Sequence, residues 1–217
     1  MTTTHLEAVQ LVDAAAENDV ERIHELIRNG VSADCMHPQT GRRALHEAAL
    51  HGNEKALRAL ISSGCNLRVK TMMGRETALH LAAMHGHEII LRTLLRRCSA
   101  LSMMWNRSGQ QAIHLALDAS CCYTLLEYGD NVDPFVRDAQ GRTPLATASE
   151  RGEVSAGVVQ MLQERQEIIL RERLKRERAE REERRKHLEA ARAEENSLRK
   201  AEEDERLKRA YLRHRWK

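Results

Sequence analysis

Apolar and polar positions in residues 6–162 follow a pattern that returns about every 33 residues. Each period contains a short Ala-rich stretch, such as ALHEAAL from Ala44, then a His-Gly break and a second stretch, such as EKALRALISSG from Glu54. Apolar residues recur at helical spacing in the second stretch. Each period therefore predicts a unit of turn, helix, turn and helix.

The two predicted helices of a unit differ in the faces they bury. Alanine pairs in the first helix, at Ala48 and Ala49 and again at Ala82 and Ala83, allow a neighbouring helix to pack closely. Neither helix buries enough apolar surface alone, so successive units must stack to form a core. In the second helix of the third unit, the positions predicted to be buried are Ile89, Ile90, Leu94 and Leu95.

Histidines and glycines mark the register of this repeat. The histidines lie 34 residues apart, and a glycine precedes each copy by a nearly constant interval. A register of this kind indicates a repeated structural unit. The histidines are His46, His80 and His114, and the glycines are Gly41, Gly74, Gly109 and Gly141.

The segments RALHEAA, TALHLAA, QAIHLAL and TPLATAS resemble the TPLHxAA signature of the ankyrin repeat. LVDAAAENDVERIHELIRNGVSAD resembles the N-terminal capping repeat of that family, so the resemblance covers residues 6–162 in five units. It implies an all-α fold, an ankyrin-repeat solenoid of helix-turn-helix units, and the composition of the following segment predicts that this solenoid continues into a long single charged α-helix. The fourth unit, ALDASCCYTLLEYG, lacks the His-Gly break, which predicts altered stacking there. In the fifth, Ala146 replaces the histidine, as in a terminal repeat.

The C-terminal stretch differs from the repeats in composition. After Gly157 it has no Gly or Pro and is rich in strong helix formers, which predicts one continuous helix. Nine acid-to-base pairs at i, i+4, such as Glu167 with Arg171, support it at about 0.3 kcal/mol each. No heptad seam runs through it, because steps of seven from Ile169 meet Arg176 and Glu183. The expected organisation is an N-terminal tail in residues 1–5, the repeat domain in 6–162 and a charged C-terminal helix in 163–217.

Composition and charge limit the kinds of partner. The chain is 41% hydrophobic, 31% charged and only 3% aromatic, which favours helical packing of small residues. Its net charge of +3 divides into 19 Lys and Arg against 14 Asp and Glu in residues 164–217, and 16 against 18 in residues 1–163. Carboxylates dilute the basic excess of the tail, so it does not resemble a nucleic-acid-binding arm. We therefore do not expect nucleic acid as the main partner.

The sequence lacks the marks of an enzyme, a metal site or a membrane protein. It contains no GxSxG, HExxH or phosphate-binding glycine loop, and no cofactor is expected. No apolar run is long enough to span a membrane, and the N-terminus has no secretory pattern, so we expect a cytoplasmic or other intracellular protein. The five cysteines show no CxxC spacing and are interpreted as packed or free thiols; they are Cys35, Cys65, Cys98, Cys121 and Cys122.

The resemblance assigns a structural role to the three signature histidines. In ankyrin repeats, the imidazole forms hydrogen bonds with backbone groups of the turns and ties neighbouring units together, which implies this role for His46, His80 and His114. The proximity of His80, His85 and His87 suggests a metal site as an alternative, but these positions follow the repeat and not ligand spacing.

The same resemblance implies a concave protein-binding face formed by turn tips and inner helices. Trp105, flanked by Met104 and Arg107, is the predicted anchor, because Trp and Arg often dominate binding energy and Met adapts to irregular surfaces. An alternative is that these residues pack between repeats. At the C-terminus, Tyr211 and Trp216 are predicted to form a docking tip. The predicted tip residues of the repeats are Arg42, Arg43, Met72, Met73, Arg75, Trp105 and Arg107, and the inner-helix residues are Leu50, His51, Met84 and His85.

These features predict a non-enzymatic scaffold or adaptor that binds one protein through its repeats and another through its helix. Sixty helical residues reach about 90 Å, which suits a structural component of the cytoskeleton or of a ciliary or flagellar microtubule complex. Acidic surfaces such as those of tubulin would match the cationic tips. Two alternatives are a soluble regulatory or recruiting adaptor and an RNA-associated subunit of a ribonucleoprotein.

Overall fold

The computed structural model describes residues 5–215, with the side chains of 153, 154, 207, 208 and 210–215 left aside. Within that range there is no β-strand, only an isolated antiparallel bridge between Met36 and Arg43. The predicted all-α ankyrin-type fold with a long C-terminal helix is confirmed. The helices are α1 (His5–Ala16), α2 (Val20–Arg28), α3 (Ala44–Leu50), α4 (Glu54–Ser62), α5 (Ala78–Met84), α6 (Glu88–Arg97), α7 (Ala112–Leu115), α8 (Ala119–Tyr128), α9 (Pro144–Glu150) and α10 (Ala156–Arg215), with short 3₁₀ helices at Ser99–Met103 and Gly152–Ser155.

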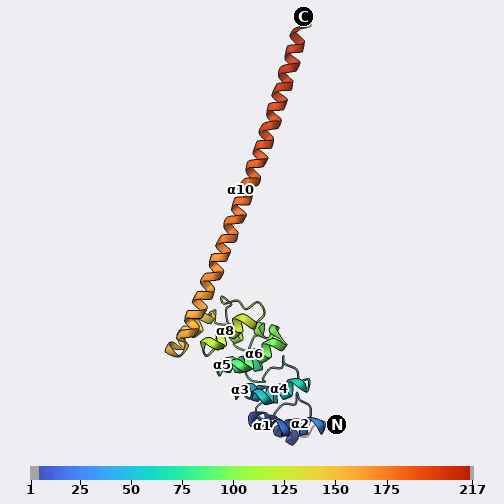
Figure 1. Cartoon of the computed structure of the whole chain (residues 1–217), viewed down its shortest axis with the longest axis vertical. Helices are drawn as coiled ribbons and strands as arrows, with labels where there is room; N and C mark the ends of the chain where they lie inside the picture. Colours follow the sequence, from blue (N-terminus) through green and yellow to red (C-terminus); the bar gives the residue numbers. More distant parts are fainter. Residues whose placement is uncertain (1–4, 216–217) are drawn as a thin grey trace. The chain divides into compact units, whose positions relative to one another are not determined.

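Successive helix pairs stack in chain order in the compact unit formed by residues 1–166. The inner helices α1, α3, α5, α7 and α9 pack on one another in that order, and the outer helix α4 packs between α2 and α6. Figure 1 shows the pairs α1/α2, α3/α4 and α5/α6 one above the other. Each pair therefore covers the apolar face of the next, as expected for a solenoid.

The core follows the predicted division between small and large residues. Ala48, Ala49, Ala82 and Ala83 are all fully buried, so the inner helices approach closely. In α6, the buried face consists of Ile90, Leu91, Leu94 and Leu95. The prediction for Ile89 is wrong: its side chain is 55% exposed, because consecutive helical residues point about 100° apart and Ile90 and Leu91 face the core.

A row of hydrogen bonds joins neighbouring units at the His-Gly turns. The amide nitrogen of Asn53 donates to the carbonyls of Ala15 and Ala16, at 2.9 and 2.7 Å. His87, one unit later at the same position, is linked through Nε2 to the carbonyl of Leu50 at 2.9 Å. These bonds give His87 a structural partner in the preceding unit.

The fourth unit is shortened, with α7 covering only four residues. Leu117 N–H donates to the carbonyl of Ala83 at 3.0 Å, so the chain still bonds to the preceding unit after the early helix end. Asp118 then accepts a hydrogen bond from Cys121 N–H at 2.7 Å and caps α8. The thiols of Cys121 and Cys122 in this helix are buried in the core, and burial raises the pKa of both.

Helix α10 belongs to the stack only at its start. Val158 and Leu162 are buried in the core of the first unit. Residues 167–217 form a second compact unit, in which every described side chain from Leu170 onward is exposed. Of the eight predicted acid-to-base pairs whose two side chains are described, four lie within ion-pair distance; they are Glu167–Arg171, Glu182–Lys186, Glu195–Arg199 and Glu205–Arg209.

Candidate protein-binding surface

Four loops, which we call fingers, precede the inner helices α3, α5, α7 and α9. They cover residues 36–43, 70–77, 104–111 and 137–143. A backbone hydrogen bond across its base closes each finger: His37 N to Arg42 O at 2.7 Å, Thr71 N to Glu76 O at 2.8 Å, Asn106 N to Gln110 O at 2.9 Å and Asp138 N to Arg142 O at 2.9 Å.

Neighbouring fingers are also bonded to one another through their backbones. The N–H groups of Met72, Arg107 and Ala139 each donate to a carbonyl of the preceding finger: Gly41 at 3.3 Å, Gly74 at 2.8 Å and Ser108 at 3.1 Å. One such bond crosses every boundary between fingers. The four fingers therefore form a bonded row and not a set of independent loops.

The first residue of each closing pair also caps the turn with its side chain. Asn106 Oδ1 accepts from Ser108 N–H and Gln110 N–H, both at 2.9 Å, and Asp138 Oδ1 accepts from Gln140 N–H and Arg142 N–H at the same distance. His37 and Thr71 accept equivalent bonds in the first two fingers. Sequence reasoning missed this function, although the four residues recur at nearly the same interval as the signature histidines.

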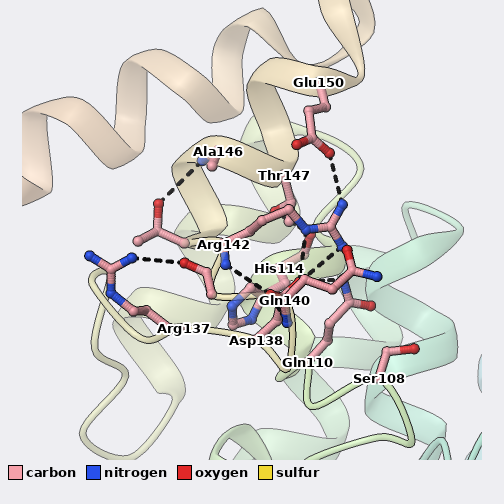
Figure 2. A network of polar contacts seen from close by, with 12 residues as sticks. Ser108, Gln110, His114, Arg137, Asp138, Gln140, Arg142, Ala146, Thr147 and Glu150 are labelled. Atoms are coloured by element: carbon pink, nitrogen blue, oxygen red, sulfur yellow. Dashed lines mark hydrogen bonds and ion pairs between the residues drawn. The ribbon is translucent and has the colours of Figure 1, made fainter.

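Figure 2 shows the last finger, where Arg142 lies between two carboxylates. Its guanidinium donates to Asp138 Oδ2 at 2.9 Å and to Glu150 at 2.9 Å, which ties the finger to the end of α9. Burial raises the pKa of Asp138, but hydrogen bonds from Arg142 and Gln140 outweigh it and leave that pKa below its ordinary value. The Asp138 side chain is therefore a carboxylate that stabilises the finger.

His46 and His80 each connect an inner helix to the row of fingers. Nδ1 of each accepts a backbone N–H at the start of its own helix, from Arg43 at 3.1 Å and Thr77 at 3.3 Å. Nε2 of His46 is linked at 3.2 Å to the carbonyl of Val69, directly before the second finger, and Nε2 of His80 is linked at 3.0 Å to the carbonyl of Gln110 in the third finger. Because Nδ1 accepts, the proton lies on Nε2. Burial lowers the pKa of both imidazoles to about 4.

His114 differs from the other two histidines. Its Nδ1 accepts Gln111 N–H at 3.2 Å, but its buried Nε2 has no hydrogen-bond partner. The expected link to the next turn is thus not formed at this position. Instead, the fifth unit supplies donors to the fourth: Thr147 Oγ1 donates to the His114 carbonyl at 3.1 Å, and Arg151 donates to the carbonyls of His114 and Ala116.

The second finger holds an arginine where the others have glycine. Gly41, Gly109 and Gly141 have φ of 65°, 65° and 79° directly before the closing residue, and Arg75 has φ of 52° at that place. Only glycine adopts this left-handed region without a steric cost. In the structure, the residue that corresponds to Gly41, Gly109 and Gly141 is therefore Arg75. Gly74, which the sequence pattern aligned with them, lies one residue earlier.

Five of the predicted tip residues lie exposed on the second and third fingers. Met72 and Met73 are 65% and 76% exposed, and Trp105 is 41% exposed. Lys70 Nζ donates to the Trp105 carbonyl at 2.6 Å, which fixes the backbone beneath the indole. Met104, by contrast, packs against the core. We call the exposed set the finger surface; it consists of Met72, Met73, Arg75, Trp105 and Arg107.

The two arginines of the first finger are engaged within the molecule. Arg43 Nε donates to the Asp34 carbonyl at 3.0 Å and its Nη1 to the Lys70 carbonyl at 3.1 Å, so it joins the first two fingers. Arg43 was predicted to contact a partner, and two of its guanidinium nitrogens are bonded within the chain. Arg42 Nη1 contacts Glu47 at 3.3 Å and remains partly exposed.

The inner-helix candidates lie away from the fingers. Leu50 and Met84 are half-buried at the last residues of α3 and α5, followed by exposed His51 and His85. Each helix begins beside a finger and runs for seven residues, a length of about 10 Å. The structure thus separates these residues from the finger surface. Of the predicted docking tip, Tyr211 lies in α10 with its side chain undescribed, and Trp216 lies outside the described residues.

The described part of the chain contains no metal site, no disulfide and no helix that could span a membrane. Its His, Cys, Asp and Glu residues form no group that could hold a metal ion. All five cysteines are free thiols. Within the same residues, no helix is both long enough and apolar enough to cross a membrane.

Comparison with known proteins supports the nature of the repeats. Residues 11–103 match the family model of ankyrin repeats, in three copies. The matched range covers the first three helix pairs and ends in the 3₁₀ helix after α6. No curated protein matches the chain.

Proposed function

Because the chain is an ankyrin repeat protein, we propose that it is a non-enzymatic scaffold whose finger surface binds a partner protein. Ankyrin repeats are a protein-interaction module, and the finger surface offers the residue types that dominate such contacts. Trp105 supplies a large rigid apolar group, and the two methionines adapt to an uneven partner.

The observation that carries this proposal is the conformation of Arg75. A non-glycine residue in the left-handed region costs about 1–2 kcal/mol, and Gly74 stands directly beside it in the sequence. Backbone strain of this kind is concentrated at functional sites. An exposed guanidinium held at the tip of a finger in spite of this cost is best explained by a contact outside the chain.

The chemistry of the surface also indicates the partner. The exposed residues of the finger surface include two cations, Arg75 and Arg107, and large apolar side chains such as Met73 and Trp105. Arg107 is exposed, and its Nη1 donates to the Met73 carbonyl at 3.3 Å, which joins the second and third fingers at this surface. The matching partner presents an apolar side chain with carboxylates beside it.

Site-specific photo-crosslinking in native extract tests the proposal. A photoreactive residue at Met73 should capture a discrete protein, and the substitution Arg75→Gly should reduce the yield although it leaves the fold intact. The control carries the photoreactive residue at Tyr123, which is also exposed but lies on α8. Equal capture from both positions, or capture that ignores Arg75, would contradict the assignment.

The setting we propose is a large intracellular assembly, with cytoskeletal or ciliary microtubules as the first candidate. Two features support it: α10 has 60 residues, about 90 Å of helix, and the finger surface carries cations. Co-sedimentation of purified protein with microtubules tests this setting. Absence from the pellet would favour a soluble regulatory adaptor, and binding to RNA that falls steeply with salt would favour a ribonucleoprotein subunit.

A further inference from the structure

A second surface lies on the outer helices, away from the fingers. A groove of about 780 Å³ crosses α2, α4 and α6, which are neighbours in the stack. It uses none of the finger residues, so its argument is independent of the function proposed above. Four cationic side chains line it: Lys55 and Arg58 from α4, and Arg96 and Arg97 from α6.

These cations have few partners within the molecule. Arg58 pairs with Glu54 at 2.5 Å, and Arg96 lies over the ring of Tyr128 at 5.6 Å. Lys55 and Arg97 have no hydrogen bond or ion pair among the described residues. No carboxylate lines the groove. Its positive charge is therefore largely uncompensated.

The four cations of the groove stand out against the net charge of the repeats. Residues 1–163 hold 16 Lys and Arg against 18 Asp and Glu, so the repeats as a whole are slightly acidic. Four of those 16 cations meet in one groove. A concave surface of one sign attracts ligands of the opposite sign and raises their local concentration.

The floor of the groove requires that the ligand also carry apolar groups. Ala59 is buried there, and Val20 and Ile61 are half-buried, so the groove has apolar side chains in its lining beside the cations. Nucleic acid is a poor match, because His24 is the one aromatic side chain among the described residues that line the groove, and four cations neutralise few phosphates. A carboxylate-bearing peptide with aliphatic side chains matches both the cations and the floor.

We propose that this outer groove binds an acidic peptide segment of a partner protein, with its aliphatic side chains on the floor and its carboxylates on Lys55, Arg58, Arg96 and Arg97. Three stacked helices span about 20 Å at ordinary packing distances. An extended segment of about six residues covers that length. The protein would thus have two docking surfaces, one on the fingers and one on the outer helices.

Fluorescence anisotropy with the full-length protein tests this proposal. The probe is a labelled peptide of about ten residues in which glutamates flank and separate two leucines, and the matched peptide has glutamine at every glutamate. We expect the glutamate peptide to bind and the glutamine peptide to bind at least about tenfold more weakly. Equal binding of the two peptides, or binding of neither, overturns the proposal.

Charge reversal locates the binding site. Lys55→Glu with Arg97→Glu should weaken binding of the glutamate peptide about tenfold or more, because two attractions become repulsions. Arg178→Glu with Lys200→Glu on α10 changes the net charge equally and should leave binding unchanged. Circular dichroism verifies folding, and Lys55→Gln with Arg97→Gln replaces the first pair if reversal prevents folding. Equal losses in the two pairs, or displacement of the peptide by an RNA oligonucleotide at lower concentration than by unlabelled peptide, would refute the site.

Discussion

Acidification from pH 7 to pH 5 should destabilise the repeats through two buried histidines. His46 and His80 are fully buried, and each uses Nδ1 as an acceptor for a backbone N–H and Nε2 as a donor to a carbonyl in the next finger or directly before it. A second proton on the ring would place a charge in the core. It would also turn Nδ1 into a donor that faces another donor. The two links between finger row and helix would then be lost.

The magnitude follows from the pKa of each imidazole in the two states. Burial lowers it from 6.5 to about 4 in the folded protein. The folded state thus binds protons less readily, so the stabilisation is complete above pH 6.5 and is lost as pH falls toward 4. Between pH 7 and pH 5 the loss is about 2 kcal/mol for each histidine and about 4 kcal/mol for both. That is a large part of a typical stability of about 5–15 kcal/mol.

Other groups do not reverse this trend. The pKa of His114 is also lowered by burial, which acts in the same direction. Asp138, whose pKa lies below 3.8, loses its contribution only at pH values under the chosen window. The fall in stability between pH 7 and pH 5 is therefore assigned to the imidazoles.

Urea unfolding at pH 7, 6 and 5 measures this loss. A Trp216→Phe background leaves Trp105 as the single indole, so fluorescence reports on the third finger. The variant His46→Gln with His80→Gln should be less stable at pH 7, and down to pH 5 it should keep only the part of the pH response that His114 contributes. Replacement of exposed His85 by Gln should retain the wild-type profile. A free energy of unfolding that changes by less than about 1 kcal/mol over this range would refute the reasoning, as would a full pH response in the double variant.

Three further substitutions test the packing and the fingers by urea denaturation. Arg75→Gly should raise the free energy of unfolding by about 1 kcal/mol by relieving the left-handed backbone, and a lower urea midpoint would contradict this. Leu91→Ala should cost about 2–5 kcal/mol, whereas Ile89→Ala on the same helix should cost about 0.5 kcal/mol or less; similar costs would disprove the assigned faces. Arg43→Lys should cost about 1–3 kcal/mol because it leaves the carbonyls of Asp34 and Lys70 without their donor, and a cost no larger than that of Arg42→Lys would argue against this role.

The helix pairs could be predicted from the sequence because their determinants are local and repeated. Small residues at Ala48 and Ala82 recur one repeat apart, and each is followed by a His-Gly break that ends the helix. The shortened fourth unit was also visible, since its break is missing. Such features depend on residues near one another in the chain, so pattern reasoning suffices.

The details of the fingers depend on bonds between residues far apart in the chain. Arg43 looks like an exposed cation in the sequence, but it bonds to Lys70, 27 residues later. The second finger closes between Thr71 and Glu76, so the left-handed position falls on Arg75 although Gly74 is adjacent. The outer groove likewise combines side chains from three units. None of these arrangements has a periodic signal of its own.

The strained conformation of Arg75 and the row of bonded fingers are two parts of one arrangement. An isolated loop would relax from a left-handed arginine, because one closing bond contributes only about 1 kcal/mol. Here the second finger is closed by Thr71 and Glu76, bonded to the first finger through Met72, and bonded to the third through the Gly74 carbonyl. Strain of this size persists only where the surroundings fix it from several sides. A partner that docks on Met73 and Trp105 therefore meets a surface that is already ordered, and the entropy of ordering it was lost when the repeats folded.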